Sequence, residues 1–101
     1  ATWSGIAGTV TNATSQAIAG ATVRTFHHED NEWLLDYETT TDVNGNYEIP
    51  ADAGVPVVVA VYKSGYVTSY YDGANSFETA ETVTPVNREE TQGIDFELVA
   101  D

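Results

Sequence analysis

Apolar and polar residues alternate along much of this chain with a period of two, which is the pattern of β-strands that bury one face. The segment 94–98 is the clearest case, because Ile94, Phe96 and Leu98 alternate with two acidic residues. The segment 6–10 shows a similar alternation. No long stretch has the apolar period of an α-helix, and turn residues recur about every ten positions. The pattern predicts an all-β chain.

The alternation predicts about seven short strands, and that number in a chain of 101 residues is typical of an antiparallel β-sandwich. The segment 55–63 is apolar on both faces, so we expect it near the middle of a sheet and covered on both sides. The predicted strands are 3–11, 21–28, 33–41, 47–49, 55–63, 66–71 and 94–98, with a further short strand at 82–86.

The segment 33–41 alternates less cleanly than the others. A strict period of two divides it into a first face and a second, more polar face that we expect to be solvated. The first face is Trp33, Leu35 and Tyr37, and the second is Leu34, Asp36 and Glu38.

The charge balance limits the partners of the chain. Sixteen acidic residues stand against three basic ones, which gives a formal charge of −13 at neutral pH. Such a domain repels nucleic acid and anionic membranes, so neither is expected as a partner. The longest apolar run, 55–62, is too short to cross a bilayer, and nothing resembles a signal peptide. Without cysteine the chain forms no disulfide and has no thiolate for catalysis or metal binding.

The segment 39–49 predicts a strand, a tight turn and a second strand. Asp42 and Asn44 carry acceptors for nearby backbone N–H groups, and Gly45 can adopt the positive φ that such a turn requires. Tyr47 begins the second strand and is expected to bury its ring while its hydroxyl stays near a polar partner. These four residues are expected to be structural.

Five segments, in this order, carry a family resemblance. They are the opening strand 6–10, the Gly-Ala-x-Val segment within 17–23, the Thr-x-Asp-x-x-Gly-x-Tyr hairpin 40–47, the Lys-x-Gly-Tyr turn 63–66 and the closing strand 93–98. Together they resemble the carboxypeptidase regulatory-like domain, although Ala17 stands where that family commonly has proline. The resemblance implies a transthyretin-like (prealbumin-like) β-sandwich. Gly8 and Gly20 are expected where a side chain would block contact between the sheets.

The same resemblance implies a role without catalysis. A domain of this family would be an accessory module of a secreted or cell-surface protein, a spacer or stabiliser beside a catalytic or adhesive domain. We therefore expect residues 1–101 to be one domain cut from a larger multidomain protein, monomeric, extracellular and in contact with its neighbouring domains. No cofactor is required for such a role.

Catalytic motifs are missing from the sequence. The zinc carboxypeptidases use His-x-x-Glu, and neither His27 nor His28 has glutamate three residues later. Adjacent strand residues also point to opposite faces, so the two imidazoles are poorly placed to share one metal ion. No Gly-x-Ser-x-Gly sequence is present. No catalytic residue is assigned, and the chain is not expected to be an enzyme.

Carbohydrate binding is the alternative function. Aromatic rings that stack on the apolar face of a sugar would carry it, and the candidates are Trp33, Trp3, Tyr62, Tyr70 and Tyr71. Tyr70 and Tyr71 are neighbours, so they face opposite ways and one of them belongs to the core. A polysaccharide would then be the ligand, and docking on a protein partner is the third alternative.

Calcium is the cofactor that the carboxylate excess allows, either as a structural ion or as a bridge to a sugar. The ion prefers six to eight oxygen ligands. The first candidate loop is Glu29, Asp30, Asn31 and Glu32. Weaker candidates are the set Asp42, Asn44 and Asn46 and the pair Asp72 and Asn75.

Overall fold

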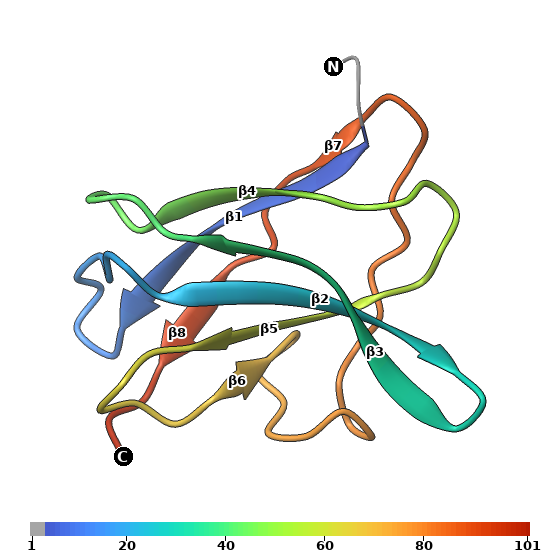
Figure 1. The fold of residues 1–101 in the computed structure, drawn as a ribbon. Helices are drawn as coiled ribbons and strands as arrows, with labels where there is room; N and C mark the ends of the chain where they lie inside the picture. The colour runs from blue at the N-terminus through green and yellow to red at the C-terminus, as the bar shows by residue number, and fades with distance from the viewer. Residues whose placement is uncertain (1–3) are drawn as a thin grey trace.

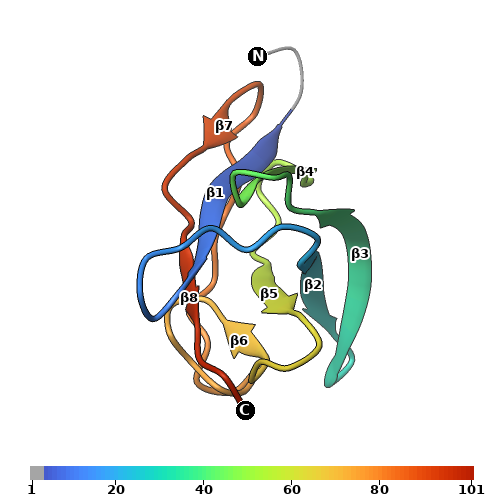
Figure 2. The same ribbon diagram turned by 90° about the vertical axis from the view of Figure 1, so that its left-hand side faces the viewer.

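Two β-sheets packed face to face make up the fold, as the two views in Figure 1 and Figure 2 show. The computed structural model describes residues 4–101, so the candidate ligand-binding residue Trp3 lies outside the described residues. The predicted all-β sandwich is confirmed. Residues 4–101 hold no helix of the length and apolar character needed to cross a membrane. The strands are β1 (Gly5–Asn12), β2 (Thr22–Glu29), β3 (Glu32–Thr40), β4 (Asn46–Pro50), β5 (Val58–Tyr62), β6 (Ser69–Tyr70), β7 (Glu90–Thr91) and β8 (Phe96–Leu98).

The first sheet is built around β1. β4 pairs with one edge of β1 in antiparallel fashion, and β7 and β8 pair in parallel with its other edge. These two parallel pairings differ from the antiparallel arrangement expected throughout. A short hairpin forces two strands to run antiparallel, whereas the chain reaches β7 through the long connection 71–89. β8 then continues in the same direction (Figure 1).

The second sheet has the order β3-β2-β5-β6, and every pair in it is antiparallel. β2 and β3 form a hairpin whose two turn residues, Asp30 and Asn31, have φ angles of 53° and 64°. Two consecutive positive φ angles are typical of a type I′ turn, whose twist matches that of the strands it joins. The nine-residue β3 is left as an edge strand.

β3 contains one residue more than the part of β2 that it pairs with. Thr25 is opposite Tyr37, but the next residue, Phe26, is opposite Leu35. Asp36 is therefore a β-bulge.

The bulge makes the expected faces of the segment 33–41 wrong. A one-residue insertion exchanges the two faces of a strand beyond it. Trp33 and Leu35 consequently share the outer face of the sheet with Glu38, while Tyr37 points the other way and packs on the core. The alternation of residue types alone did not show where the register changes.

The core lies between the two sheets. The expected burial of 55–63 on both faces is confirmed for residues 57–61, which are at most 4% exposed, although the strand itself is shorter than expected. The strand expected at 82–86 is wrong, because only Val83 forms an isolated bridge there. Other buried apolar residues include Ile6, Val10, Val23, Ile49, Phe96 and Leu98.

Gly8 and Gly20 were expected where a side chain would block a close contact, and the structure confirms this for Gly8 alone of the two. A Cβ on Gly8 would lie 1.9 Å from the carbonyl oxygen of Ile94, so the chain before β8 can approach β1 this closely only at a glycine. At Gly20 the expectation is wrong. Its φ is 72° and the nearest atom to an added Cβ would be Nζ of Lys63 at 3.4 Å, so this glycine serves a turn.

The turn before β4 packs against β1. Oδ1 of Asp42 accepts hydrogen bonds of 2.9 Å from the backbone N–H groups of Asn44 and Asn46. Gly45 has a φ of 76°, and its carbonyl oxygen accepts a 2.8 Å hydrogen bond from the N–H of Val10. An added Cβ on this glycine would also lie 2.5 Å from the carbonyl oxygen of Val10, so the position combines a left-handed backbone with a close approach.

Candidate functional site

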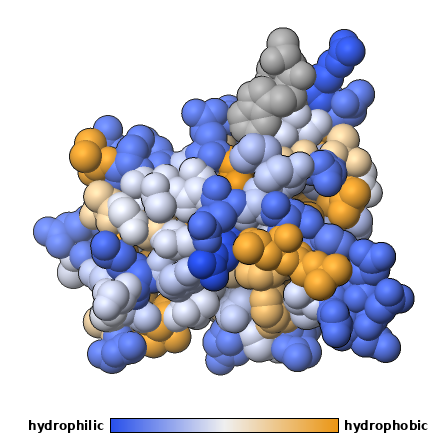
Figure 3. Space-filling model, in the orientation of Figure 1, coloured by the Kyte–Doolittle hydropathy of each residue, from blue (hydrophilic) through white to orange (hydrophobic). Residues whose placement is uncertain are grey.

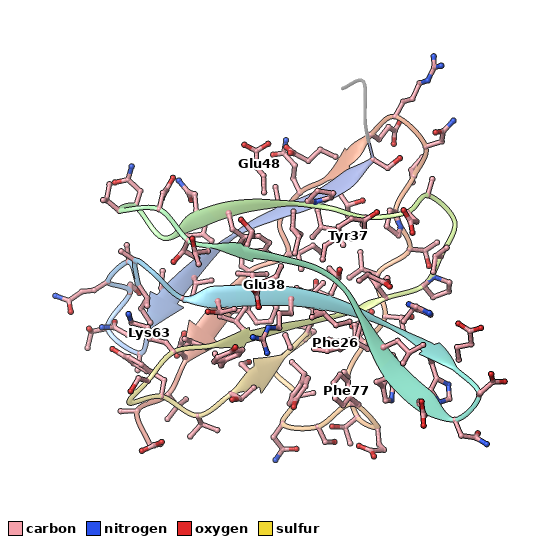
Figure 4. The ribbon with its side chains drawn as sticks, in the orientation of Figure 1. Phe26, Tyr37, Glu38, Glu48, Lys63 and Phe77 are labelled. Carbon is pink, nitrogen blue, oxygen red and sulfur yellow. The ribbon has the colours of Figure 1, made fainter. Side chains whose placement is uncertain are left out.

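Aromatic side chains gather on the outer face of the second sheet, the side that faces the viewer in Figure 4. Phe26 and Tyr70 belong to strands, whereas Phe77 comes from the irregular segment 71–81. The Phe77 ring lies 5.0 Å from that of Phe26, nearly perpendicular to it, and 4.8 Å from that of Tyr70. We refer to Phe26, Trp33, Tyr70 and Phe77 as the aromatic cluster. It fastens the segment 71–81 to the sheet and explains why β5 is buried on this face as well.

Trp33, the first candidate for sugar binding, uses its indole within the protein. The indole stacks on the His28 imidazole at 4.8 Å and 29° and on the Phe77 ring at 5.1 Å and 10°. Its side chain is only partly exposed. A sugar that stacked on Trp33 would have to displace one of these neighbours.

The two neighbouring tyrosines lie in different environments. Tyr70 is on the outer face in the aromatic cluster, whereas Tyr71 packs against the core, with its ring 6.0 Å from that of Phe96. Burial and nearby carboxylates raise the pKa of Tyr71. Of the two, Tyr70 is the one placed for contact with a ligand.

A groove of about 310 Å³ opens beside the aromatic cluster. Ala60 of β5 is its only small non-polar residue, and larger side chains surround it. This volume is at the lower end of the range of about 300–1,000 Å³ found for small-molecule sites. The lining residues are Arg24, Phe26, Ala60, Tyr62, Thr68, Tyr70 and Phe77. We refer to this hollow as the aromatic groove.

An ion pair borders the aromatic groove. Nε of Arg24 donates a hydrogen bond of 2.5 Å to Oε1 of Glu38, its cross-strand partner on β3. The same guanidinium lies 4.5 Å from the centre of the Tyr62 ring, in a cation–π contact. The hydrogen bond to Glu38 raises the pKa of Arg24, so the guanidinium remains charged. Figure 4 shows Glu38, Phe26 and Phe77 over the same sheet.

The first candidate calcium loop is the end of the β2–β3 hairpin. Asp30 and Asn31 are its turn residues, and Glu29 and Glu32 are a cross-strand pair. The Glu29 carboxylate lies 3.1 Å from Nε2 of His27. Within residues 4–101, no three His, Asp or Glu side chains are grouped so as to hold a metal ion. Calcium binding remains a prediction for this loop.

His27 lies between two carboxylates at this end of the hairpin. Besides its contact with Glu29, its Nδ1 lies 2.5 Å from Oδ1 of the bulged Asp36. Hydrogen bonds to Glu29 and Asp36 raise the pKa of His27. His28 points to the other face and stacks on Trp33, so the imidazoles of His27 and His28 do not face a common site.

In the weaker calcium candidates, side-chain oxygens are partly engaged. Oδ1 of Asp42 accepts backbone hydrogen bonds in its own turn, and Oδ1 of Asn46 accepts a 2.8 Å hydrogen bond from the hydroxyl of Thr9. Asp72 and Asn75 are exposed in the segment 71–81.

A carboxylate pair lies on the outer face of the first sheet. Glu48 of β4 and Glu90 of β7 come from the two strands that flank β1. A hydrogen bond with Glu48 raises the pKa of Glu90, because the two carboxyl groups share a proton more readily than they carry two negative charges. Figure 4 shows Glu48 on β4, far from the aromatic cluster.

The sequence did not identify most of the residues around the aromatic groove. Phe26, Phe77, Arg24 and Glu38 were not among the candidates, and Ala60 gave no signal. Their juxtaposition depends on the bulge in β3 and on where the segment 71–81 folds back. A partial signal was the placement of Tyr62 and Tyr70 in adjacent predicted strands.

A model of the family described as the carboxypeptidase regulatory-like domain matches residues 5–99. No curated protein sequence matches the chain. Among solved structures, it is similar to catechol 1,2-dioxygenase from Acinetobacter radioresistens, with a TM-score of 0.58, 18% identity and coverage of 96% of this chain and 52% of that one.

Two further structures are similar to the chain at comparable levels. For 3-chlorocatechol 1,2-dioxygenase from Rhodococcus opacus the TM-score is 0.58 and the identity 14%, with coverage of 96% and 59%. For a type II cohesin–X-dockerin complex from Acetivibrio cellulolyticus the TM-score is 0.55 and the identity 17%, with coverage of 95% and 57%. This chain thus spans little more than half of each of those chains. At such identities the likeness shows the fold alone.

Proposed function

Because the chain belongs to the carboxypeptidase regulatory-like domain family, we propose that it is an accessory module with no catalytic role of its own. It works beside a catalytic or adhesive domain of a secreted or cell-surface protein, as a spacer or stabiliser. The observation that carries this proposal is the family match over residues 5–99, nearly the whole chain. One folding unit of residues 1–101, monomeric and linked to neighbouring domains, is part of the proposal.

The environment of the two histidines supports a role without catalysis. Histidine is the side chain that most often serves as a general base. Both nitrogens of His27 are engaged by carboxylates, and the His28 imidazole is stacked on Trp33. Both histidines are thus engaged in contacts that hold the β2–β3 hairpin together.

Two measurements test the proposal. The purified chain should unfold in one cooperative transition and turn over none of a panel of ester, peptide and glycoside substrates. In the full-length parent protein, deletion of this domain should lower the melting temperature of the adjacent domain. The deletion leaves the active-site residues of the adjacent domain in place. Turnover that co-purifies with the chain and is lost on unfolding would overturn the proposal.

Carbohydrate binding is the second candidate, and the aromatic groove favours it. Sugar sites combine rings that stack on apolar faces with polar groups that fix hydroxyl positions, and the groove has Tyr62, Tyr70 and Phe77 beside Arg24. Electrophoresis through gels that contain soluble polysaccharides tests this candidate. A polysaccharide that retards the wild-type chain but not Tyr70→Ala supports it, and no retardation by any polysaccharide rejects it.

Docking on a protein is a third candidate, for which the surface of β3 is the argument. Hydrophobic atoms gather over β3 on the face toward the viewer (Figure 3), and Leu34 and Leu35, which point to opposite faces of this strand, are 37% and 52% exposed. The cohesin–X-dockerin complex is an assembly of proteins that contains a similar fold. Leu34→Asp and Leu35→Asp should then weaken the association of this domain with an isolated neighbouring domain.

A further inference from the structure

The aromatic groove has a regular origin in the pairing of four strands. Arg24 is opposite Glu38 on one side and Ala60 on the other, and Ala60 is opposite Tyr70. Directly opposed residues point to the same face of a sheet and lie about 5 Å apart. Glu38, Arg24, Ala60 and Tyr70 therefore form one row across the outer face. The methyl group of Ala60 is the low point between two long side chains.

The walls of the groove are apolar rings. Tyr62 lies two residues after Ala60 on the same face of β5, and Phe26 lies two residues after Arg24 on β2. Phe77 closes the far side, where its ring is 4.8 Å from that of Tyr70. The hollow of about 310 Å³ thus combines an apolar floor with ring surfaces on two sides.

The charged end of the row supplies both donors and acceptors for hydrogen bonds. A guanidinium has five N–H donors, and Arg24 gives the one on Nε to Glu38. The Glu38 side chain remains about half exposed, at 48%, and the Arg24 side chain is 33% exposed. The pair is held by the salt bridge and by the Tyr62 ring. A fixed donor beside a fixed acceptor matches two neighbouring hydroxyl groups, each of which both donates and accepts.

The charge of the protein decides between classes of sugar. The chain carries a formal charge of −13, and the single cation of the groove is already paired with Glu38. A uronic acid or a sulfated sugar would meet the repulsion of the whole domain, with no unpaired cation among the described residues of the groove to offset it. An uncharged sugar ring has no such cost.

We infer that the aromatic groove binds an uncharged pyranose unit of a neutral polysaccharide. The sugar ring lies over Ala60 between Tyr62 and Phe77, and two neighbouring hydroxyls contact Arg24 and Glu38. This assignment rests on the carbohydrate-binding function proposed above and places it in the groove instead of at Trp33. It also names the polar residues that select the ligand.

Calorimetry and NMR with defined oligosaccharides test the assignment. The neutral probes are hexasaccharides of β-1,4-glucose, β-1,3-glucose, α-1,4-glucose, β-1,4-xylose and β-1,4-mannose, and the acidic probe is a hexasaccharide of galacturonic acid. We expect at least one neutral probe to bind and to shift the backbone amide signals of residues 24, 38, 60 and 70. The acidic probe should bind at least about tenfold more weakly.

Three variants and two matched controls locate the site. Ala60→Leu fills the hollow, Glu38→Gln removes the charged acceptor and Tyr70→Ala removes a wall, so each should weaken binding of the neutral probe by about tenfold or more. Leu35→Ala, on the same face, and Glu97→Gln, on β8, should leave the affinity unchanged. Circular dichroism checks that each variant is folded. If Ala60→Leu does not fold, the affinity of Glu38→Gln still tests the site.

The outcomes separate this assignment from the broader function. Neutral binding that survives both Ala60→Leu and Glu38→Gln would overturn the groove while leaving carbohydrate binding in place. Preference for the acidic probe would overturn the choice of a neutral ligand. The absence of binding by every probe would overturn the groove and carbohydrate binding together, and the accessory role would stand.

Discussion

The hydroxyl of Tyr47 donates a 2.6 Å hydrogen bond to the carbonyl oxygen of Ile94, which joins β4 to the chain that leads into β8. Tyr47 is only 3% exposed, and burial raises its pKa, so the hydroxyl stays protonated and keeps donating at alkaline pH. The same carbonyl oxygen of Ile94 is the atom that a Cβ on Gly8 would meet. The carbonyl group of Ile94 thus accepts a hydrogen bond from Tyr47 of β4 and leaves no room for a side chain at Gly8 of β1.

Gly8→Ala should destabilise the domain by at least about 3 kcal/mol, because a backbone oxygen 1.9 Å from the new Cβ has to move. Urea unfolding followed by tryptophan fluorescence measures the change. Gly54→Ala is the matched control: its φ of 78° costs about 1–2 kcal/mol, but an added Cβ meets no atom within 4 Å. Equal losses in the two variants would show that the contact between Gly8 and Ile94 is not tight.

Thr25→Val should stabilise the domain. Thr25 is fully buried, and its Oγ1 has no hydrogen-bond partner among the described residues, so a methyl group of the same shape removes a desolvated hydroxyl. We expect a gain of about 1 kcal/mol and a rise in melting temperature of roughly 4–8 °C by calorimetry.

Thr41→Val is the control for that gain, because the same change should have the opposite sign there. The Thr41 hydroxyl accepts from the N–H of Ala21 and donates to the carbonyl oxygen of Ile18 at 2.6 Å. Its removal leaves both backbone groups without that partner and should cost about 1–3 kcal/mol. A lower melting temperature for Thr25→Val would mean that its hydroxyl has a partner in solution.

The β2–β3 hairpin should be more stable in mild acid than in base. Glu29 and Asp36 raise the pKa of His27 above its ordinary 6.5. The stability that protonated His27 adds to the folded state is therefore fully present below pH 6.5 and is lost as the pH rises through the folded-state pKa. The difference between urea midpoints at pH 5.5 and pH 8.5 should shrink in His27→Gln. His28→Gln should preserve it, and an NMR titration of the His27 ring that gives a pKa below 6.5 would contradict this account.

Glu48→Gln should stabilise the domain at neutral pH. The pKa of Glu90 is raised by Glu48, so the favourable contact is fully present below pH 4.5 and is lost as the pH rises through the folded-state pKa, which leaves two like charges across β1. The variant should therefore melt higher than wild type at pH 7, with a smaller gain near pH 4. Glu97→Gln is the matched control for the general loss of a negative charge, and the same gain in both would show that net charge alone is responsible.

Calcium binding at the end of the hairpin is tested by melting in millimolar Ca²⁺. A site among Glu29, Asp30, Asn31 and Glu32 that is saturated a hundredfold above its Kd would add about 2.7 kcal/mol, or about 10–20 °C. Asp30→Asn should abolish the rise. An equal rise in NaCl of the same ionic strength would reflect screening of the acidic surface and reject the site.

The parts of the fold that follow from local pattern were predictable. The alternation in 94–98 and the apolar run in 55–63 correctly place Ile94, Phe96, Leu98 and residues 57–61 in the core, because burial demands apolar side chains at those positions. The parallel pairing of β7 and of β8 with β1 was not predictable, because no turn motif encodes the direction in which a strand runs after a long connection.

The arrangement of side chains on the outer face of the second sheet could not be predicted from the sequence either. Asp36 is a single inserted residue in an otherwise regular strand, and it turns Trp33 and Leu35 away from where alternation places them. Phe77 lies in a segment without periodicity, so its contact with Phe26 is decided by tertiary packing. The bulge sets the pairing of Arg24 with Glu38 beside the aromatic groove, and the packing of the segment 71–81 brings Phe77 to its wall.

The bulge at Asp36 also affects how copies of this domain behave at high concentration. A long, regular border strand invites a second chain to add to it and begin a fibril, whereas a kink with a carboxylate in its middle interrupts the ladder that such growth would need. The irregularity that the alternation of residue types did not reveal thus disfavours the addition of another strand at this edge of the sheet.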